Sequence, residues 1–495
     1  MVILIKVLQF FLSLSILIFV HELGHFLAAK AFKTRVEKFY LFFDWGFSLF
    51  RCKKVNGQWR FKFFSKNVPE KYTTTEYKDA AGKKQTKYDP IDLNTLPEDD
   101  WRRSDSTEYG IGWFPLGGYN KIAGMVDESM DKSQMQQPPQ PWEFRSKPAW
   151  QRFIIMVAGV FMNVVLAFAV YIGLLAIKGE EYLPTSEANK YGISVDSLGY
   201  DLGFRDGDKI LEVDGKYIEK FQDVPMQIIL DKAKTVKVNR NGADTLINLP
   251  EDAVAKLLNS QDANFISIRW PFVVDSVVSN SVAQKGGLLS GDVIIGLNDI
   301  ETPYYQDFVK NVKRFKNQDI EIRVVRRVRE ESDTLALAMH LPDEGVIGAY
   351  VASPESCFKI KKKDYTFFQA IPAGFSKTIK ELDGYWKQVK LIFSPKTKAY
   401  QSVGGFISIG KIFPETWDWL KFWAMTAFLS IALAVMNILP IPALDGGHIL
   451  FLLIEIITRR KPSDKFMEVA EMIGLILVLG LVILANGNDI IKLFK

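Results

Sequence analysis

The residues best suited to chemistry are His21-Glu22-Leu23-Gly24-His25, two histidines four positions apart with a glutamate between them. On a helix, residues four apart share one face, so both imidazoles can reach one metal ion. Zinc suits imidazole ligands, and a catalytic zinc usually has three protein ligands and a water whose pKa falls to about 7. The motif therefore predicts a hydrolytic Zn2+ site, with His21 and His25 as ligands and Glu22 as the base that takes the proton of water.

The motif lies inside an apolar stretch that runs from Val2 to about Ala29. Burying two histidines and a glutamate in a membrane helix costs several kcal/mol unless they are paired or bound. One alternative is a secretory signal peptide, because Lys6 and the apolar run after it are typical of such a leader. Another is a polar patch that only packs helices together. A signal peptide gains nothing from the motif, so we favour a membrane helix that carries a metal site.

A third ligand must come from another apolar segment, and the candidates are Asp445 and His448. They end the sequence Asn437-Ile-Leu-Pro-Ile-Pro-Ala-Leu-Asp-Gly-Gly-His448, in which two prolines break a helix and two glycines allow a tight turn. Irregular backbone at membrane depth is tolerated where it is buried in protein or lines a cavity. Chemistry favours Asp445, which that backbone would present, and leaves His448 as a rival ligand or a supporting group.

Four apolar stretches predict transmembrane helices, because a span needs about 17–25 residues. They are Val2–Ala29, Phe153–Ile177, Phe422–Ile441 and Met472–Ala485, the last completed by the turns of Phe466–Glu471. The shorter run His448–Thr458 is expected to be re-entrant or interfacial. Lys and Arg cluster after the first span, before the second, and between the third and fourth, so these segments are expected in the cytoplasm. Both termini and the loop from about Lys178 to Asp418 are then expected outside it.

The long loop contains a repeat, in which Gly203–Gly215 aligns with Gly287–Asp299 at an offset of 84 residues. Its glycines predict turns with positive φ, and the apolar residues after them predict strands. The pattern G-[LF]-x-x-G-D-x-I resembles PDZ domains, which bind peptides by adding a strand to a sheet edge. After the repeat, apolar residues from Phe375 to Phe393 fall at helical spacing. Such a helix can pack on the second module or lie in the membrane interface.

The composition excludes several classes of protein. With 495 residues, 48% hydrophobic and 24% charged, the chain is neither disordered nor collagen-like, and two distant cysteines form no disulfide framework. A net charge of +5 gives no reason to expect nucleic acid as a partner. The polar stretch Lys53–Asp105 predicts an insertion with weak or partly disordered structure.

The HELGH motif in the first span and N-x-x-P-x-P-x-L-D-G-G at the end of the third resemble the site-2 proteases, zinc metalloproteases that act inside membranes. Four spans with tandem PDZ modules between the second and third resemble the regulator of sigma-E protease (RseP) subgroup. The resemblance implies a zinc site made by His21, His25 and Asp445, which selects Asp445 over His448, and Glu22 as the catalytic residue.

Further motifs give substrate-binding candidates through the same resemblance. Asn437 is expected to help hold the substrate helix. Gly112–Tyr119 resembles a membrane-associated β element that pairs an edge strand with unwound substrate, which implies substrate contacts by Gly117, Gly118 and Tyr119; a plain turn is the alternative. Gly159–Asn163 resembles a G-P-x-x-N pattern without its proline and adds Asn163 as a substrate contact, with helix packing as the alternative.

The predicted fold is a polytopic α-helical membrane protein with about four transmembrane helices, a tandem pair of PDZ-like α/β domains and a small membrane-associated β element. The expected segments are the first span with the zinc site at 1–30, a cytoplasmic loop with the insertion and β element at 31–148, the second span at 149–177, PDZ-like modules at 178–262 and 263–345, amphipathic helices and a linker at 346–418, the third span with the LDGG segment at 419–458, and the fourth span at 459–495.

The expected function is an intramembrane zinc endopeptidase that cuts single-span membrane proteins within their transmembrane segments. The resemblance implies anti-sigma factors and signal-peptide remnants as substrates, and PDZ modules that gate substrate size. It also implies a bacterial inner membrane, with the lipid bilayer as a partner, the PDZ modules on the periplasmic side and the active site facing the cytoplasmic half. The alternatives are a catalytically inactive PDZ scaffold anchored in the membrane, which cleavage would exclude, and a metal transporter, which metal flux would reveal.

Overall fold

The computed structural model describes residues 1–67, 72–78, 84–125, 138–259, 265–328, 331–401 and 403–494. The chain forms two compact units. The first unit comprises Met1–Lys178, Tyr365–Trp386 and Val403–Lys495, and the second comprises Gly179–Asp364 and Lys387–Ser402. All the predicted site residues belong to the first unit.

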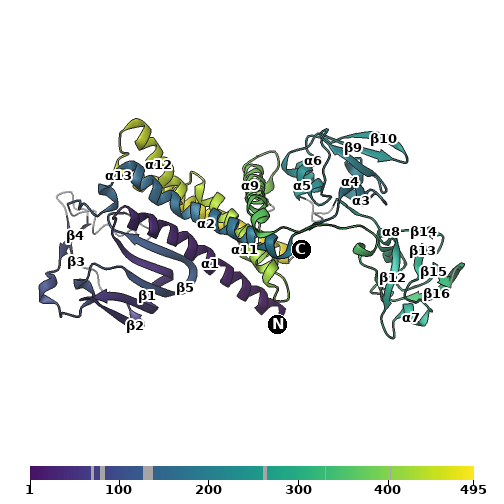
Figure 1. The fold of residues 1–495 in the computed structure, drawn as a ribbon, viewed down its shortest axis with the longest axis horizontal. Helices are drawn as coiled ribbons and strands as arrows, with labels where there is room; N and C mark the ends of the chain where they lie inside the picture. Colours follow the sequence, from purple (N-terminus) through teal and green to yellow (C-terminus); the bar gives the residue numbers. More distant parts are fainter. Residues whose placement is uncertain are drawn as a thin grey trace. The chain divides into compact units, whose positions relative to one another are not determined.

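Four helices of the first unit are long and apolar enough to cross a membrane, as predicted. They are α1 (Val2–Ala31), α2 (Ala149–Lys178), α11 (Trp419–Ile438) and α13 (Asp464–Leu493). α1, α2 and α11 pack against one another (Figure 1). α12 (Asp445–Thr458) has 14 residues and is not among the candidate spans of the described residues, since such a helix is too short to cross the hydrocarbon core.

The break between α11 and α12 brings Asp445 to the start of a helix. Pro440 and Pro442 lack the N–H groups that would continue α11. Ala443 then turns the chain with a φ of +75°. Gly446 allows α12 to begin against the preceding turn, because a Cβ there would lie 2.0 Å from a backbone oxygen of that turn. The prolines and glycines of the motif thus act through the backbone.

A sheet beside α1 is built from β1 (Val36–Val55), β2 (Gln58–Lys66) and β5 (Glu108–Ile122), in the order β2-β1-β5 (Figure 1). The pairing of β1 with β5 shifts register between Phe43 and Ser48. Tyr40 of β1 is paired with both Gly110 and Tyr119 of β5. Among the described residues, Gly118–Ile122 pair with β1 alone, so this end of β5 forms an edge of the sheet.

The prediction of weak structure in Lys53–Asp105 is wrong for much of that segment. Gln58–Lys66 is a strand in register with β1, and Trp101 is buried. Alternating aromatic and basic residues account for the strand, since neighbouring side chains point to opposite faces. A further hairpin joins β3 (Tyr72–Lys78) to β4 (Lys84–Pro90). Residues 68–71 and 79–83 lie outside the described part of the chain.

The helix predicted after the repeat is α9 (Phe367–Ile392). Within the first unit it packs against membrane helices. The rings of Phe375 and Phe168 in α2 have centroids 5.8 Å apart, and those of Tyr385 and Phe428 in α11 are 6.0 Å apart. These two contacts are with spans of the first unit. The last residues of α9 belong to the second unit, where Leu391 forms a buried cluster with Val254 and Ala399. α10 (Phe406–Lys411) packs against α13.

Among its described residues, the second unit has two large hydrophobic cores, one formed by residues between Ala188 and Ile266 and one by residues between Phe272 and Ile347. The first contains α3 (Thr185–Ala188), β7 (Ile193–Val195), α4 (Ser197–Asp201), β8 (Lys209–Val213), α5 (Asp223–Leu230), β9 (Thr235–Arg240), β10 (Ala243–Asn248), α6 (Ala253–Asn259) and β11 (Ile266–Ile268). The second contains β12 (Phe272–Val277), α7 (Val282–Lys285), β13 (Val293–Leu297), β14 (Ile300–Glu301), α8 (Tyr305–Val312), β15 (Gln318–Val328), β16 (Glu331–Leu341) and β17 (Ala349–Val351). β6 (Glu180–Tyr182) pairs with β18 (Lys361–Lys363).

The sequence repeat is also a structural repeat. The predicted positive φ values occur at equivalent glycines, +98° at Gly203 and +83° at Gly287. In the first copy, Arg240 donates to the Asp208 carboxylate and to the carbonyl oxygen of Gly203. In the second, Arg326 donates in the same way to the Asp292 carboxylate and the Gly287 carbonyl oxygen. Each aspartate of the G-D pair therefore ties a turn to a strand of its own core.

Candidate active site

A cavity of about 450 Å³ lies in the first unit, between α1, α2, the edge of β5, the α11–α12 connection and α13. Its lining includes eight of the nine predicted site residues: His21, Glu22, His25, Gly117, Gly118, Tyr119, Asn437 and Asp445. Asn163 is the ninth and is fully buried outside that lining. Residues separated by more than 400 positions in the sequence therefore share one cavity.

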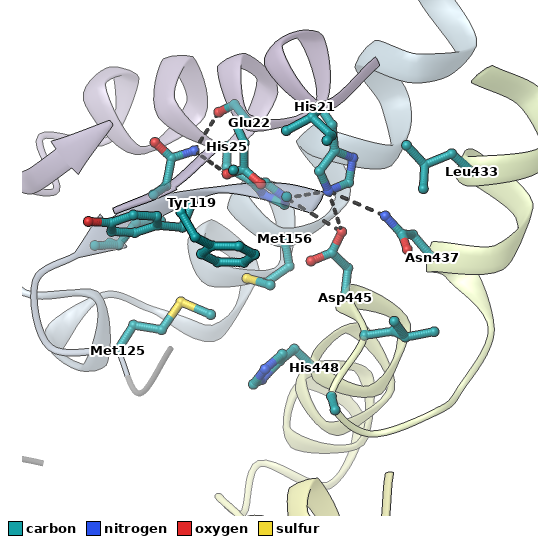
Figure 2. Close-up of a pocket in the computed structure, with 18 of the residues that line it drawn as sticks. His21, Glu22, His25, Tyr119, Met125, Met156, Leu433, Asn437, Asp445 and His448 are labelled. Carbon is teal, nitrogen blue, oxygen red and sulfur yellow. Dashed lines mark hydrogen bonds and ion pairs between the residues drawn. The ribbon is translucent and has the colours of Figure 1, made fainter. Parts of the chain in front are cut away.

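Three of these residues converge on one point (Figure 2). Asp445 Oδ2 lies 3.1 Å from His21 Nε2 and 3.4 Å from His25 Nε2, and the two Nε2 atoms are 3.3 Å apart. Asp445 Oδ2 is buried and accepts no hydrogen bond from any described residue. Two imidazole nitrogens and one carboxylate oxygen form a donor set that fits Zn2+ and leaves a fourth position for water.

Backbone and amide groups behind the histidines can orient their rings. His25 Nδ1 lies 2.8 Å from the carbonyl oxygen of Ile155, which can only accept a hydrogen bond. Nδ1 therefore carries the proton, and Nε2 keeps its lone pair for a metal. Asn163 lies 3.2 Å from His21 Nδ1, and its buried Oδ1 has no described donor. Exchanging the oxygen and nitrogen of this amide would let Oδ1 accept the Nδ1 proton and free His21 Nε2 in the same way. Asn163 thus supports a histidine, and nothing here supports the expected substrate contact.

Gly159 of α2 provides the space for the two imidazoles. A Cβ at this position would lie 2.3 Å from His25 Nε2 and 2.8 Å from His21 Cε1, closer than atoms approach. The glycine of the Gly159–Asn163 motif therefore has a steric role that its sequence pattern did not reveal. α2 therefore contributes Asn163, which contacts His21, and Gly159, which leaves room for both imidazole rings.

The carboxylate of Glu22 is held by a residue that the sequence did not single out. Asn120 Nδ2 donates to Glu22 Oε2 at 2.8 Å and to the backbone oxygen of Glu22 at 2.6 Å. Asn120 and Gly118 are two residues apart on a strand and so share a face. The sequence signal for Asn120 was its position two residues after Gly118, directly next to the predicted Gly117-Gly118-Tyr119 segment.

The remaining predicted residues lie around this group. Asn437 Nδ2 is 3.4 Å from His21 Nε2, at the cavity wall. The Tyr119 hydroxyl donates to Asp44 at 2.9 Å, and burial next to that carboxylate raises the pKa of the phenol. The rival ligand His448 lies on the far side of Asp445 from His21 (Figure 2). Its Nε2 is 3.9 Å from a carboxylate oxygen of Glu471 in α13, and it is outside the converging group.

Residues 9–66 and 100–481, most of the chain, match the sequence model of peptidase family M50. The chain belongs to peptidase family M50. The protease is 28% identical to Protease RseP of Yersinia pestis over 98% of each chain. It is 25% identical to the Regulator of sigma E protease of Haemophilus influenzae over 79% of this chain and 89% of the relative. A Rickettsia conorii protein named as a zinc metalloprotease is 23% identical over 99% of this chain. This membrane protein is therefore a site-2 zinc metalloprotease.

Proposed function

We propose that this protease hydrolyses peptide bonds within the transmembrane segments of single-span membrane proteins, with His21, His25 and Asp445 as the zinc ligands and Glu22 as the general base. The observation that carries the proposal is the convergence of the three ligand atoms, within 4.8 Å of one another, in a cavity walled by membrane helices. A metal site among membrane helices would give access to substrate bonds that soluble proteases do not reach.

The residues of the cavity divide the reaction between them. When bound, zinc polarises the scissile carbonyl and lowers the pKa of a water molecule. Glu22 accepts a proton from the attacking water and passes it to the leaving amine, so that the products leave without an uncompensated charge. The amide of Asn437 lines the same cavity next to His21. From there it can donate a hydrogen bond to the substrate carbonyl oxygen, where negative charge develops.

The edge of β5 offers a template for the substrate backbone. A helical segment already uses its own N–H and C=O groups, so it must unwind before its carbonyl carbons become accessible. Gly117, Gly118 and Tyr119 line the cavity on the unpaired edge of the sheet, and an extended substrate could add to it as a further strand. The two glycines let this segment pack closely, because a Cβ would lie 2.3 Å from the Phe43 ring at Gly117 and 2.7 Å from Ile18 Cγ2 at Gly118.

The two cores of the second unit are proposed to be PDZ-like modules that act as a size filter. The repeated Gly-Asp turns and their arginine ties support a tandem origin. We place the protease in a bacterial inner membrane, with these modules in the periplasm and the active site facing the cytoplasmic half. Anti-sigma factors and signal-peptide remnants are the proposed substrates, in line with the names of the RseP relatives.

The test of the activity is cleavage of a single-span anti-sigma-type substrate, trimmed of its external domain, by the full-length protease in liposomes. Mass spectrometry of the fragments locates the scissile bond. The proposal expects one cut inside the apolar span, abolished by a zinc chelator and restored by added Zn2+. A cut confined to residues outside the span, or cleavage that persists with the chelator, would contradict it.

The filter has its own experiment with the same protein. A series of substrates that share one span but carry external domains of increasing size is cleaved in parallel. The proposal expects the rate to fall as the domain grows, while the position of the cut stays the same. Equal rates across the series would leave the protease activity in place and remove the filter.

A further inference from the structure

We propose that Asn120 is a positioning residue that ties the catalytic base to the strand expected to hold the substrate. This inference rests on the proposed role of Glu22. It assigns a function to a residue outside both the HELGH and the LDGG motifs.

The contacts of Asn120 fix the direction of its amide. Nδ2 lies 2.8 Å from Glu22 Oε2 and 2.6 Å from the Glu22 backbone oxygen. A carboxylate and a carbonyl can only accept hydrogen bonds, so the group between them must be the NH2, whose two protons serve both acceptors. One side chain therefore holds the carboxylate and the helix backbone of the same residue.

The position of Asn120 links two elements. It lies on the edge of β5, where Asn120 is paired with Phe39 of β1. Gly118, on the same face of the strand, lies against α1, because a Cβ there would be 2.7 Å from Ile18 Cγ2 and 3.6 Å from Glu22 Cγ. This close approach lets a side chain as short as asparagine reach Glu22. Asn120 thereby links β5, the strand expected to hold the substrate, to the catalytic base Glu22.

The remaining oxygen of Asn120 argues against a purely structural role. Oδ1 is buried and has no hydrogen-bond partner among the described residues. Burying an unpaired carbonyl oxygen costs free energy, and an apolar residue of the same shape would avoid that cost. What the amide gains is control of Glu22, a side chain with several rotatable bonds that must keep one orientation to accept a proton.

The test compares kcat, KM and zinc content of full-length wild type, Asn120→Leu, Asn120→Asp and Asn120→Gln with the trimmed substrate. Asn120→Leu keeps the volume and removes both donors. Asn120→Asp keeps the shape and sets a second carboxylate against Glu22. We expect both to lower kcat by about tenfold to a hundredfold, the range found when groups that orient a catalytic site are removed, with KM and zinc content unchanged. Asn120→Gln, which keeps the amide donor, should recover part of the rate.

An Asn120→Leu protein with wild-type kcat would overturn the inference, as would a defect confined to KM, which would make Asn120 a substrate-binding residue. If Asn120→Leu does not fold, Asn120→Asp decides, because normal turnover by that isosteric variant is equally incompatible with the proposal. Wild type and Glu22→Gln are run beside them. A wild type that does not cleave overturns the proposed function, whereas an active wild type beside a fully active Asn120→Leu overturns this inference alone.

Discussion

At the scale of single residues, the site depends on groups that leave room as much as on groups that bind. His21, His25 and Asp445 are the proposed zinc ligands, while Gly159 leaves the volume in which the two imidazoles fit. The carbonyl oxygen of Ile155 lies against His25 Nδ1, which leaves Nε2 free to face the proposed metal position. Ligand identity, ring orientation and clearance are therefore separable properties, and each can be changed by one substitution.

Chemistry alone favours Asp445 as the third ligand but leaves His448 as a rival. We expect Asp445→Asn to lower zinc affinity by at least about tenfold, because it removes the carboxylate charge facing both Nε2 atoms. His448→Gln should keep zinc, because His448 lies toward Glu471 and outside the ligand group. Zinc per protein after dialysis against a graded chelator measures both. Loss of zinc in His448→Gln with retention in Asp445→Asn would reverse the assignment.

Gly159→Ala tests the clearance without touching a ligand. The added methyl group would lie 2.3 Å from His25 Nε2, so the ring must move and zinc affinity should fall by at least about tenfold. Gly173→Ala, on the same helix, is the matched control, because no atom of the described residues lies within 4 Å of the position of its Cβ. Alanine is the better helix former by about 1 kcal/mol, so neither change weakens α2 itself. Equal zinc binding by the two variants would refute the steric role.

The local part of the site could be predicted from the sequence, and the long-range part could not. His21 and His25 share a face because the helix repeat places them there, whatever the rest of the chain does. Pro440 and Pro442, which precede Asp445, likewise predict irregular backbone. Local patterns placed Asn163 in a motif and Asn120 beside one, but they could not identify the partners of these residues. Those partners, His21 and Glu22, are set by how a second helix and a strand pack on α1.

At the scale of elements, the LDGG segment depends on α13 as well as on its own turn. Gly474 of α13 packs directly on the loop before Asp445, where a Cβ would lie 1.7 Å from the Pro442 carbonyl oxygen. Helices in membranes approach closely where a small residue faces the partner. α13 therefore limits the position that Pro442, and with it Asp445, can take.

The change Gly474→Ala tests this contact. The methyl group must push Pro442 or α13 aside, and we expect kcat to fall by about tenfold or more as Asp445 is displaced, in the range seen for groups that orient metal ligands. Gly480→Ala, six residues further along α13, meets no described atom within 4 Å and should keep wild-type activity. Both variants are assayed with the trimmed substrate. Full activity of Gly474→Ala would show that α13 does not fix the loop.

Sequence patterns also predicted the elements unevenly. The four spans followed from hydropathy, and the paired cores of the second unit follow the repeat. The alternating aromatic and basic residues of the strand Gln58–Lys66 were overlooked, because the segment around them is polar and highly charged and the strand itself is nearly all exposed. The two-register pairing of β1 with β5, which creates the edge at Gly118–Ile122, is a long-range arrangement that no local pattern encodes.

At the scale of the whole molecule, the two cysteines offer a natural test of topology. Cys52 belongs to the segment expected in the cytoplasm and Cys357 to the segment expected outside it, and both are free thiols. The positive-inside rule thus predicts opposite accessibility for the only two thiols of the chain.

A membrane-impermeant maleimide added to intact spheroplasts should label Cys357 and leave Cys52 unmodified. Cys52 should react only after permeabilisation, and slowly, because burial and the nearby Glu108 carboxylate raise the pKa of its thiol. Cys357→Ser and Cys52→Ser proteins assign each signal by mass spectrometry. Labelling of Cys52 in intact cells, with Cys357 protected, would invert the proposed orientation of the molecule.

The central claim is that three residues bind the metal while Glu22 performs the proton transfer. The most direct measurement is zinc content and cleavage on the same preparations of wild type, Glu22→Gln and Asp445→Asn. We expect wild type to hold zinc and cleave, Glu22→Gln to hold as much zinc without cleaving, and Asp445→Asn to lose both. Cleavage by a zinc-loaded Glu22→Gln protein at the wild-type rate would contradict the account.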